Sequence, residues 1–358
     1  MATHFEGSGH LVQETTHAPT QAPSARERGI RRLLVCLDRS PFSEVCLPYA
    51  LCLSKAFGSA VTLLHVLEAQ HERSGPRSGP HATDAVGWEI SRREASEYLN
   101  RMQQAAELSG QQVDVRLEQG HPAERITGLA RELGADLTVI GSHGEGGVVA
   151  WNLGSTVQQV LAVARGSVLV ARSSSAAPSA ECPKRLLVPL DGSLRTESVL
   201  PTAARIARTY GAELVLLHVV EDPQPTALLR APEDLELARA LATRLESRAH
   251  AYLDHLGDPL AKEGVSVRAI VVRRADRHQA LLEIAQREGV DLVVLSAHGA
   301  TCNAARPFGS VTAHLLAHSV ISLLVLQDLP EPELYATGDV GREDVAPPLR
   351  ASFAPGAS

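Results

Sequence analysis

LLVCLDRS at residues 33–40 returns as LLVPLDGS at residues 186–193, and this repeat decides the fold of the chain. The two copies lie 153 residues apart, and the segments that follow them repeat in the same order. The later pairs are VTLLHVLE (61–68) with LVLLHVVE (214–221), ARELGADLTVIGSHG (130–144) with AQREGVDLVVLSAHG (285–299), and LGSTV (153–157) with FGSVT (308–312). Solenoid repeats span only ~20–45 residues, so this period indicates two copies of a whole domain.

Within each copy, short apolar runs alternate with amphipathic stretches, a pattern typical of strands that alternate with helices. In the first copy the predicted strands are 31–37, 60–67, 112–118, 136–142 and 167–171. The predicted helices there are 43–57, 86–109, 122–133 and 154–164, with Gly58 ending the first one and Pro122 in the first turn of the third. Such alternation predicts an α/β fold, with a doubly wound parallel sheet in each half and helices on both of its faces.

The domain boundaries follow from composition. The two domains are predicted at residues 30–172 and 183–327, joined by a linker rich in Ser, Ala and Pro at 173–182. Residues 1–29 and 328–358 are polar or rich in Pro, and we expect them to be disordered tails.

The bulk composition excludes several classes of function. A formal net charge of −7 and 3% aromatic residues argue against a nucleic-acid-binding surface. The N-terminal tail has no apolar stretch of the kind found in signal peptides, and no apolar run reaches the ~18 residues of a membrane span. We therefore expect a cytoplasmic protein that binds neither nucleic acid nor a membrane.

The five cysteines form no C-x-x-C pair and are odd in number: Cys36, Cys46, Cys52, Cys182 and Cys302. This pattern predicts reduced thiols, with Cys46 and Cys52 as core residues of an apolar helix.

A glycine-rich loop after the fourth strand is the strongest local signal. It begins at Gly141 and Gly144, and after nine further residues Gly154, Ser155 and Thr156 open a helix. Glycines allow backbone N–H groups to approach a phosphate closely, and the N-terminus of a helix favours an anion. The pattern therefore predicts phosphate binding at the carboxyl ends of the strands. The alternative is that the glycines only shape a turn.

The second half keeps this spacing with one change. Ser296 replaces the first glycine, while Gly299, Gly309 and Ser310 match the other positions. His143 and His298 lie inside the two loops and are candidates for phosphate contact, without partners at metal-ligand spacing.

Polar residues also end the first and second strands. Asp38 and Asp191 are expected to face a ligand, whereas the serines two positions later, Ser40 and Ser193, are expected to cap the next helix. The histidines that end the second strand, at positions 65 and 218, lack a nearby nucleophile, so packing is the favoured interpretation.

These elements together resemble the universal stress protein family: the strand-end D-x-S, the L-L-H-V strand, and S-H-G followed by a spaced G-S. The resemblance covers both predicted domains. It implies a five-stranded parallel sheet in the order 3-2-1-4-5 in each half, and ATP binding in some members. It also implies pairing of domains through their fifth strands, which in a tandem member occurs within one chain.

The resemblance also implies roles for individual residues. Contacts to adenine and ribose fall to Cys36, Asp38, Pro189 and Asp191, and backbone contacts to adenine fall to Val66 and Val219. Ribose and phosphates are assigned to Gly141, Gly144, Gly154, Ser155 and Thr156 in the first half, and to Ser296, Gly299, Gly309, Ser310 and Val311 in the second.

Three departures from the family pattern affect these roles. Cys36 stands where the second half has proline, and Glu145 adds a negative charge that opposes phosphate unless a cation offsets it. In the second loop, Arg306 is placed to favour phosphate.

The sequence thus predicts a regulator of the stress response that binds ATP, alone or with Mg²⁺, and signals to an unidentified protein partner. A slow ATPase or nucleotidyl-transfer enzyme is one alternative, although the chain has neither G-x-x-x-x-G-K-[ST] nor H-x-G-H. A protein-interaction module without nucleotide is the other. No catalytic or metal-ligating residue is assigned, and formation of a homodimer stays open.

Overall fold

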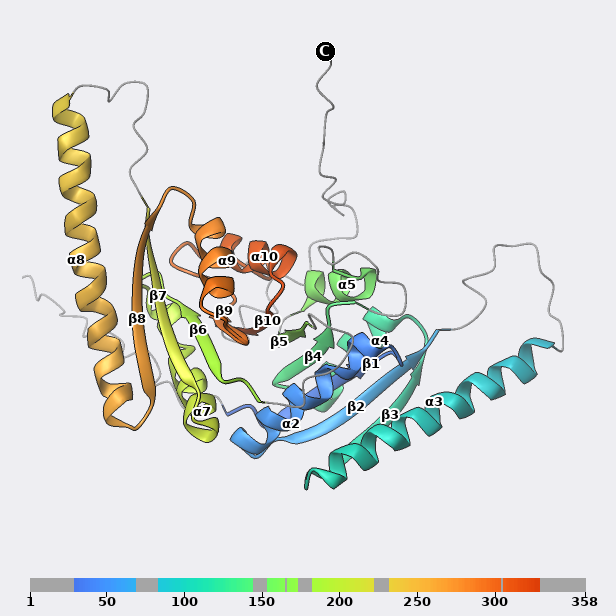
Figure 1. The fold of residues 1–358 in the computed structure, drawn as a ribbon. Helices are drawn as coiled ribbons and strands as arrows, with labels where there is room; N and C mark the ends of the chain where they lie inside the picture. Colours follow the sequence, from blue (N-terminus) through green and yellow to red (C-terminus); the bar gives the residue numbers. More distant parts are fainter. Residues whose placement is uncertain are drawn as a thin grey trace, which may run out of the picture.

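One continuous sheet runs through both halves of the protein (Figure 1). In this computed structural model the strand order is β3-β2-β1-β4-β5-β10-β9-β6-β7-β8. The structure describes residues 29–68, 83–143, 153–164, 166–172, 182–221, 232–303 and 305–328.

The first half supplies five parallel strands in the order 3-2-1-4-5, as expected. They are β1 (Arg32–Leu37), β2 (Ala60–Leu67), β3 (Val113–Gln119), β4 (Leu137–Gly141) and β5 (Ser167–Ala171). The helices are α1 (Pro41–Glu44), α2 (Cys46–Phe57), α3 (Thr83–Leu108), α4 (Pro122–Leu133) and α5 (Ser155–Val163).

The second half repeats this plan. Its strands are β6 (Arg185–Pro189), β7 (Glu213–Glu221), β8 (Ser266–Arg274), β9 (Leu292–Ser296) and β10 (Ser322–Leu326). Its helices are α6 (Leu194–Glu197), α7 (Leu200–Tyr210), α8 (Pro232–Lys262), α9 (Arg277–Arg287) and α10 (Ser310–His318). The prediction of two tandem doubly wound α/β domains is therefore confirmed.

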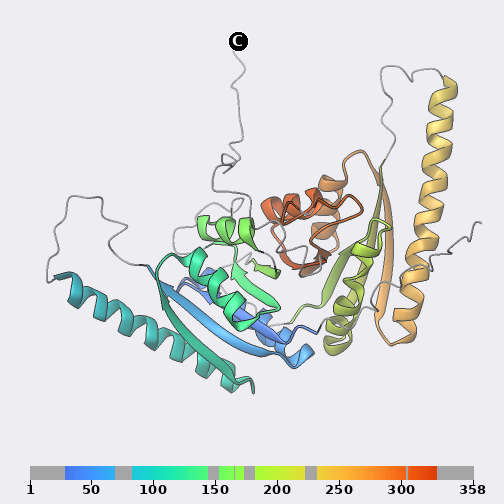
Figure 2. The ribbon, with the colours of Figure 1, turned by 180° about the vertical axis from the view of Figure 1, so that it is seen from behind.

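The two halves join where β5 and β10 pair antiparallel. Leu323 lies opposite Val170, and Val325 lies opposite Val168, with Leu324 and Leu169 between them. Pairing through the fifth strands thus occurs within the chain. Each sheet face carries its own apolar core: α2, α3, α7 and α8 cover one face and α4, α5, α9 and α10 the other (Figures 1 and 2).

The predicted first helix is divided in two, which the apolar pattern did not indicate. Ser40 caps α1, and α2 begins at Cys46. Pro48 has no N–H group with which to bond the carbonyl of Glu44, so one regular helix cannot run through both segments. The second half has the same division between α6 and α7, with Pro201 at the matching position.

Two cysteines overturn the prediction of five reduced thiols. Cys52 of α2 and Cys182, just before β6, form a disulfide across 130 residues, with their Cα atoms 5.8 Å apart. Cys46 is a free, buried core residue, as predicted. The sequence pattern failed because the two disulfide partners meet only when the second half folds against α2.

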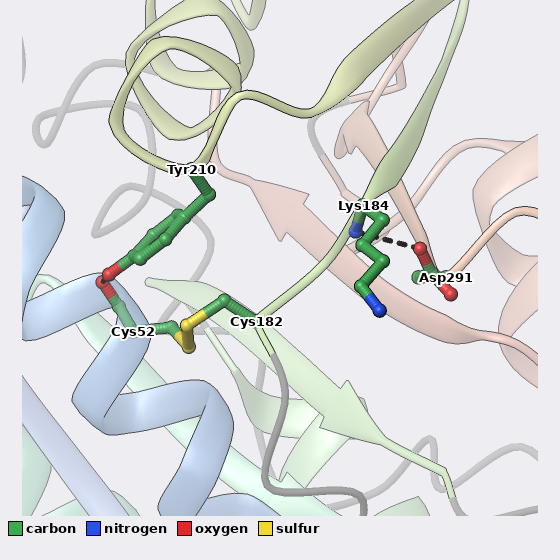
Figure 3. The surroundings of a disulfide bond; sticks show 5 residues. All are labelled: Cys52, Cys182, Lys184, Tyr210 and Asp291. Atoms are coloured by element: carbon green, nitrogen blue, oxygen red, sulfur yellow. Dashed lines mark hydrogen bonds between the residues drawn. A yellow bond between two sulfur atoms is a disulfide. The ribbon is translucent and has the colours of Figure 1, made fainter.

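The disulfide lies in a set of contacts between the halves (Figure 3). The Tyr210 hydroxyl donates to the carbonyl of Cys52 at 2.5 Å, and Arg205 of the same helix donates to the carbonyl of Ala56 at 2.8 Å. Close to Cys182 but within the second half, the Lys184 N–H donates to the Asp291 carboxylate at 2.8 Å. Helix α2 of the first half is thus held both covalently and by hydrogen bonds to the start of the second.

Replacing Cys182 by Ser is expected to lower the free energy of unfolding by about 2–5 kcal/mol, because the disulfide restricts a long loop in the unfolded chain. The measurement is urea unfolding of oxidised protein, with dithiothreitol-treated wild type expected to match the variant. Cys302→Ser is the matched control, since Cys302 is a free cysteine. Equal unfolding midpoints for Cys182→Ser and oxidised wild type would contradict the prediction.

Candidate functional site

The candidate site of the second half lies at the carboxyl ends of β6 and β9, which are neighbours in the sheet. The loop after β6 brings the Asp191 carboxylate to the loop after β9, where the Ala300 N–H donates to Asp191 Oδ2 at 2.8 Å. A Cβ atom on Gly299 would lie 2.5 Å from the same oxygen. A side chain at position 299 would therefore displace the Asp191 carboxylate, and the two predicted elements meet there.

Asp191 is held as an anion by several donors. Its Oδ1 accepts from the N–H of Ser193 at 3.0 Å, from the Ser193 hydroxyl at 2.6 Å and from the Thr196 hydroxyl at 2.9 Å. Burial opposes the charge, but these hydrogen bonds and the one from Ala300 outweigh it and lower the pKa of Asp191. The carboxylate thus joins the loop after β6 to the glycine loop.

Ser193 and Ser40 both cap short helices, as predicted. In the first half, Asp38 Oδ1 accepts from the N–H of Ser40 at 2.9 Å and from its hydroxyl at 2.6 Å. Between them Arg39 has φ 71°, where the second half has Gly192 with φ 87°. The glycine loop that would face Asp38, including Gly144 and Glu145, lies outside the described residues.

One hydroxyl group in each half was not predicted from the sequence. Ser43 and Thr196 lie five residues after the strand-end aspartates. The Asp38 N–H donates to Ser43 Oγ at 3.1 Å, and the Thr196 hydroxyl donates to Asp191 Oδ1 at 2.9 Å. The repeat itself carried this signal, because D-x-S-x-x-[ST] occurs in both halves.

His298 is buried beneath the second glycine loop. Its Nδ1 lies 3.0 Å from Asp328 Oδ1, and its Nε2 lies 2.9 Å from the carbonyl oxygen of Arg306. Both neighbours only accept hydrogen bonds, so both ring nitrogens must carry a proton. The bond to Asp328 is the main reason that the pKa of His298 is raised. The ring therefore holds its own loop with both nitrogens.

Asp328 was placed in the C-terminal tail by sequence, yet it is a buried partner of this loop. Its carboxylate accepts from the His298 N–H at 3.1 Å and pairs with Arg195 at 2.6 Å. Burial raises its pKa, but the bonds to His298 and Arg195 dominate and lower it. No local pattern marked Asp328, because it contacts the loop from 30 residues away.

The remaining predicted residues of the second site lie at the end of β9 and at the start of α10. The Ser296 hydroxyl donates to the carbonyl of His298 at 2.5 Å and is buried, while the Gly309 N–H donates to the carbonyl of Ala297 at 2.8 Å. Gly309 is the N-cap of α10 and supplies no side-chain hydrogen bond to the helix. The first-turn N–H groups, those of Ser310 and Val311 among them, therefore face outward from the helix end.

The described margins of the first loop match this arrangement. The Gly154 N–H donates to the carbonyl of Ser142 at 2.9 Å, and α5 begins at Ser155, followed by Thr156. Gly141 has a structural role beside its predicted ligand contact, since an added Cβ would lie 3.0 Å from the carbonyl oxygen of Phe42. It allows α1 to approach β4.

His143 is half-buried. Its Nδ1 lies 3.1 Å from the Ser142 hydroxyl, and its ring centroid lies 6.4 Å from that of Phe42. Phe42 occupies the position that Arg195 has in the second half, so the two candidate sites differ in charge.

The predicted adenine-contacting residues lie along the same edge of the sheet. Pro189, Val66 and Val219 are half-buried, and the two valines pack against the core on the α4 and α9 side. Burial raises the pKa of Cys36 to about 12, so its thiol stays protonated at neutral pH.

Packing of the strand-end histidines is confirmed. His65 Nδ1 lies 2.7 Å from the carbonyl of Leu37, and His218 Nδ1 lies 2.8 Å from that of Leu190. Their rings meet Tyr98 and Tyr252 edge-on. Both histidines thus tie the second strand of their half to the end of the first.

The profile described as "Universal stress protein family" matches residues 29–172 and 183–327. The chain belongs to the universal stress protein family. A universal stress protein of Mycolicibacterium smegmatis is 29% identical over 315 residues, covering 85% of this chain and 98% of its own. This universal stress protein is therefore similar to a relative that also spans both halves.

Solved structures agree on the fold. A universal stress protein from Archaeoglobus fulgidus is 20% identical with a TM-score of 0.57, covering 83% of this chain and 98% of its own. Another, solved in complex with cAMP, is 23% identical, covers 42% of this chain and all of its own, and has a TM-score of 0.32.

In the described part of this universal stress protein, no helix has the length and apolarity that crossing a membrane requires. The same residues include no group of three or more His, Cys, Asp or Glu side chains arranged to hold a metal ion.

Asp328→Asn should destabilise the protein in a pH-dependent way. Because the pKa of His298 is raised in the folded protein, protonated His298 adds to the free energy of unfolding. This added stability is full below the unfolded-state pKa, near 6.5, and is lost as pH rises through the folded-state pKa. The contribution of Asp328, whose pKa is lowered, is present above its unfolded-state pKa, near 3.8, and is lost as pH falls through the folded-state value.

The difference in melting temperature between wild type and Asp328→Asn is therefore expected to be larger at about pH 5.5 than at about pH 9. The measurement is thermal unfolding across this range. Glu263→Gln, which removes a surface ion pair with Arg208, is the control and should show a small difference that does not follow this pattern. A difference for Asp328→Asn that is constant with pH would rule out a charged His298–Asp328 pair.

Proposed function

We propose that this universal stress protein binds ATP, alone or with Mg²⁺, and that ATP occupancy regulates a protein partner in the stress response. One observation carries the proposal: the strand-end Asp191 accepts a hydrogen bond from the Ala300 N–H of the glycine loop, and Gly299 leaves space for its carboxylate. This junction lies where open α/β sheets bind their ligands, at the carboxyl ends of adjacent strands.

The phosphates would meet backbone donors in place of lysines. Helix α10 starts at a glycine without a capping side chain, so its first-turn N–H groups and the partial positive charge of the helix end are available to an anion. Arg306 is exposed in the same loop and would add a positive charge. The network of the half-exposed Arg195 with the buried Asp328 and His298 side chains would keep the loop in shape before ATP arrives.

The first half would bind a second ATP with a different affinity. Its α5 starts at Gly154 as α10 starts at Gly309. Glu145 and Phe42 replace neutral or positive groups of the second half, so less positive charge would face the phosphates.

The backbone at Gly309 makes a sharp test feasible. Its φ of −68° and ψ of 168° suit any residue, and an added Cβ would meet only ordinary contacts, at 3.5 Å from the Cα of His298. Gly154, with φ −58° and ψ 154°, is equally permissive. A larger side chain at either position should leave the fold intact and occupy the space beside the helix N-terminus that a phosphate would need.

We expect wild type to bind ATP in isothermal titration calorimetry and to unfold at a higher temperature with it, by about 2.7 kcal/mol of added stability at 100 times Kd. Gly309→Val should abolish the second-half site and Gly154→Val the first, each removing its share of the bound ATP. The melting temperature without ATP serves as the folding control. If wild type neither releases nucleotide on denaturation nor binds added ATP, nucleotide regulation is wrong.

A further inference from the structure

Helix α8 exposes an unusual row of leucines. Leu237, Leu241 and Leu245 are 71%, 50% and 41% exposed, although the other side of the same helix buries Ala242 and Leu253 against the sheet. Figures 1 and 2 show the N-terminal part of α8 extending past the ends of β7 and β8. Single exposed leucines are ordinary, but a contiguous apolar row marks a contact surface.

The spacing of the leucines suits packing against another helix. Residues four apart form one ridge on a helix surface, and two such ridges interdigitate in the commonest class of helix packing. The three leucines lie on one ridge, which we call the α8 leucine ridge. Helix α3, its counterpart in the first half, exposes Val86 and Ile90 four residues apart, but the next position on that ridge is Glu94. The exposed Leu108 is the last residue of α3.

Charges around the α8 leucine ridge are separated along the helix. Acidic residues precede the ridge and basic residues lie within and after it: Glu233, Asp234, Glu236, Arg239, Arg244 and Arg248. Across the described residues, no ion pair involves any of these six side chains. Glu246 lies among these basic residues but faces the sheet side, 3.9 Å from Arg273. Asp254 and Asp258 are acidic residues farther along α8.

This separation selects the orientation of a partner helix of the same sequence. An antiparallel pair centred on Leu241 places Asp234 opposite the partner subunit's Arg248, and Leu237 opposite the partner subunit's Leu245. A parallel pair would bring the acidic ends of both helices together, which is unfavourable. An antiparallel pair has a two-fold axis perpendicular to the helices, so the same surface of each copy forms both sides of the contact.

The sheet leaves a second copy few other places to attach. Domain pairing through a fifth strand is already satisfied inside the chain, because β5 and β10 pair with each other. The outermost strands are β3 and β8, and α8 packs beside β8 (Figure 1).

We propose that two copies of this chain associate through an antiparallel pair of α8 helices, with Leu241 of each copy at the two-fold axis. The contact is independent of ATP binding. Six leucines bury only a few hundred Å², below the ~1,200 Å² at the low end of stable interfaces, so the dimer should form in the micromolar range and dissociate on dilution.

The test is sedimentation velocity of the full chain over a dilution series without reductant, so that the Cys52–Cys182 disulfide stays intact. Wild type is expected to shift from dimer to monomer on dilution. Leu241→Glu should be monomeric throughout, because two carboxylates would meet at the axis, and its circular dichroism should be unchanged since Leu241 is half exposed. Ile90→Glu, the matched control on α3, should behave as wild type.

A charge exchange tests the orientation. Arg248→Glu should weaken the dimer at least several-fold, and adding Asp234→Arg to the same chain should restore it, because each new glutamate then faces a new arginine. Failure of this rescue would overturn the antiparallel arrangement. A wild type that stays monomeric at hundreds of micromolar, or a dimer lost in Ile90→Glu but kept in Leu241→Glu, would overturn the proposal.

Discussion

The antiparallel pairing of β5 with β10 is the contact on which the rest of the architecture depends. Each strand would otherwise be an open edge with unpaired N–H and C=O groups and with apolar residues on both faces. Joining them turns two five-stranded sheets into one. The same contact brings α2 beside α7, where Tyr210 and Arg205 reach carbonyl groups of the other half and Cys52 meets Cys182.

Duplication gave the two halves one backbone plan, and side-chain differences have since separated their sites. In both halves a strand-end aspartate, a capping serine and a hydroxyl five residues on form the same hydrogen-bonded turn. Only the second half adds Arg195 and Asp328 beneath its glycine loop. A buried charge without a partner is strongly destabilising, so the buried Asp328 carboxylate requires its cationic partners. Phe42 in the first half needs no such partner.

The glycines of the site have different structural roles, which could not be distinguished from the sequence. Gly299 leaves room for a carboxylate, Gly141 leaves room for the backbone of α1, and Gly309 is required by neither space nor conformation in the folded chain. A motif shows all three as the same letter. Only the positions of their neighbours distinguish a glycine required for folding from one that leaves space beside a helix end.

The sequence by itself determined the duplication, the order of strands and helices and some of the helix ends, because these follow from local pattern and from residues such as Gly58 and Pro122 that act on their own backbone. It also indicated the strand-end aspartates and the glycine loops. Tertiary structure alone decided the Cys52–Cys182 disulfide, the burial of Asp328 against His298 and the row of leucines left exposed on α8. Each of these depends on which distant surfaces the folded sheet brings together. Contacts between residues 130 or 30 positions apart produce no periodic pattern in the sequence from which they could be predicted.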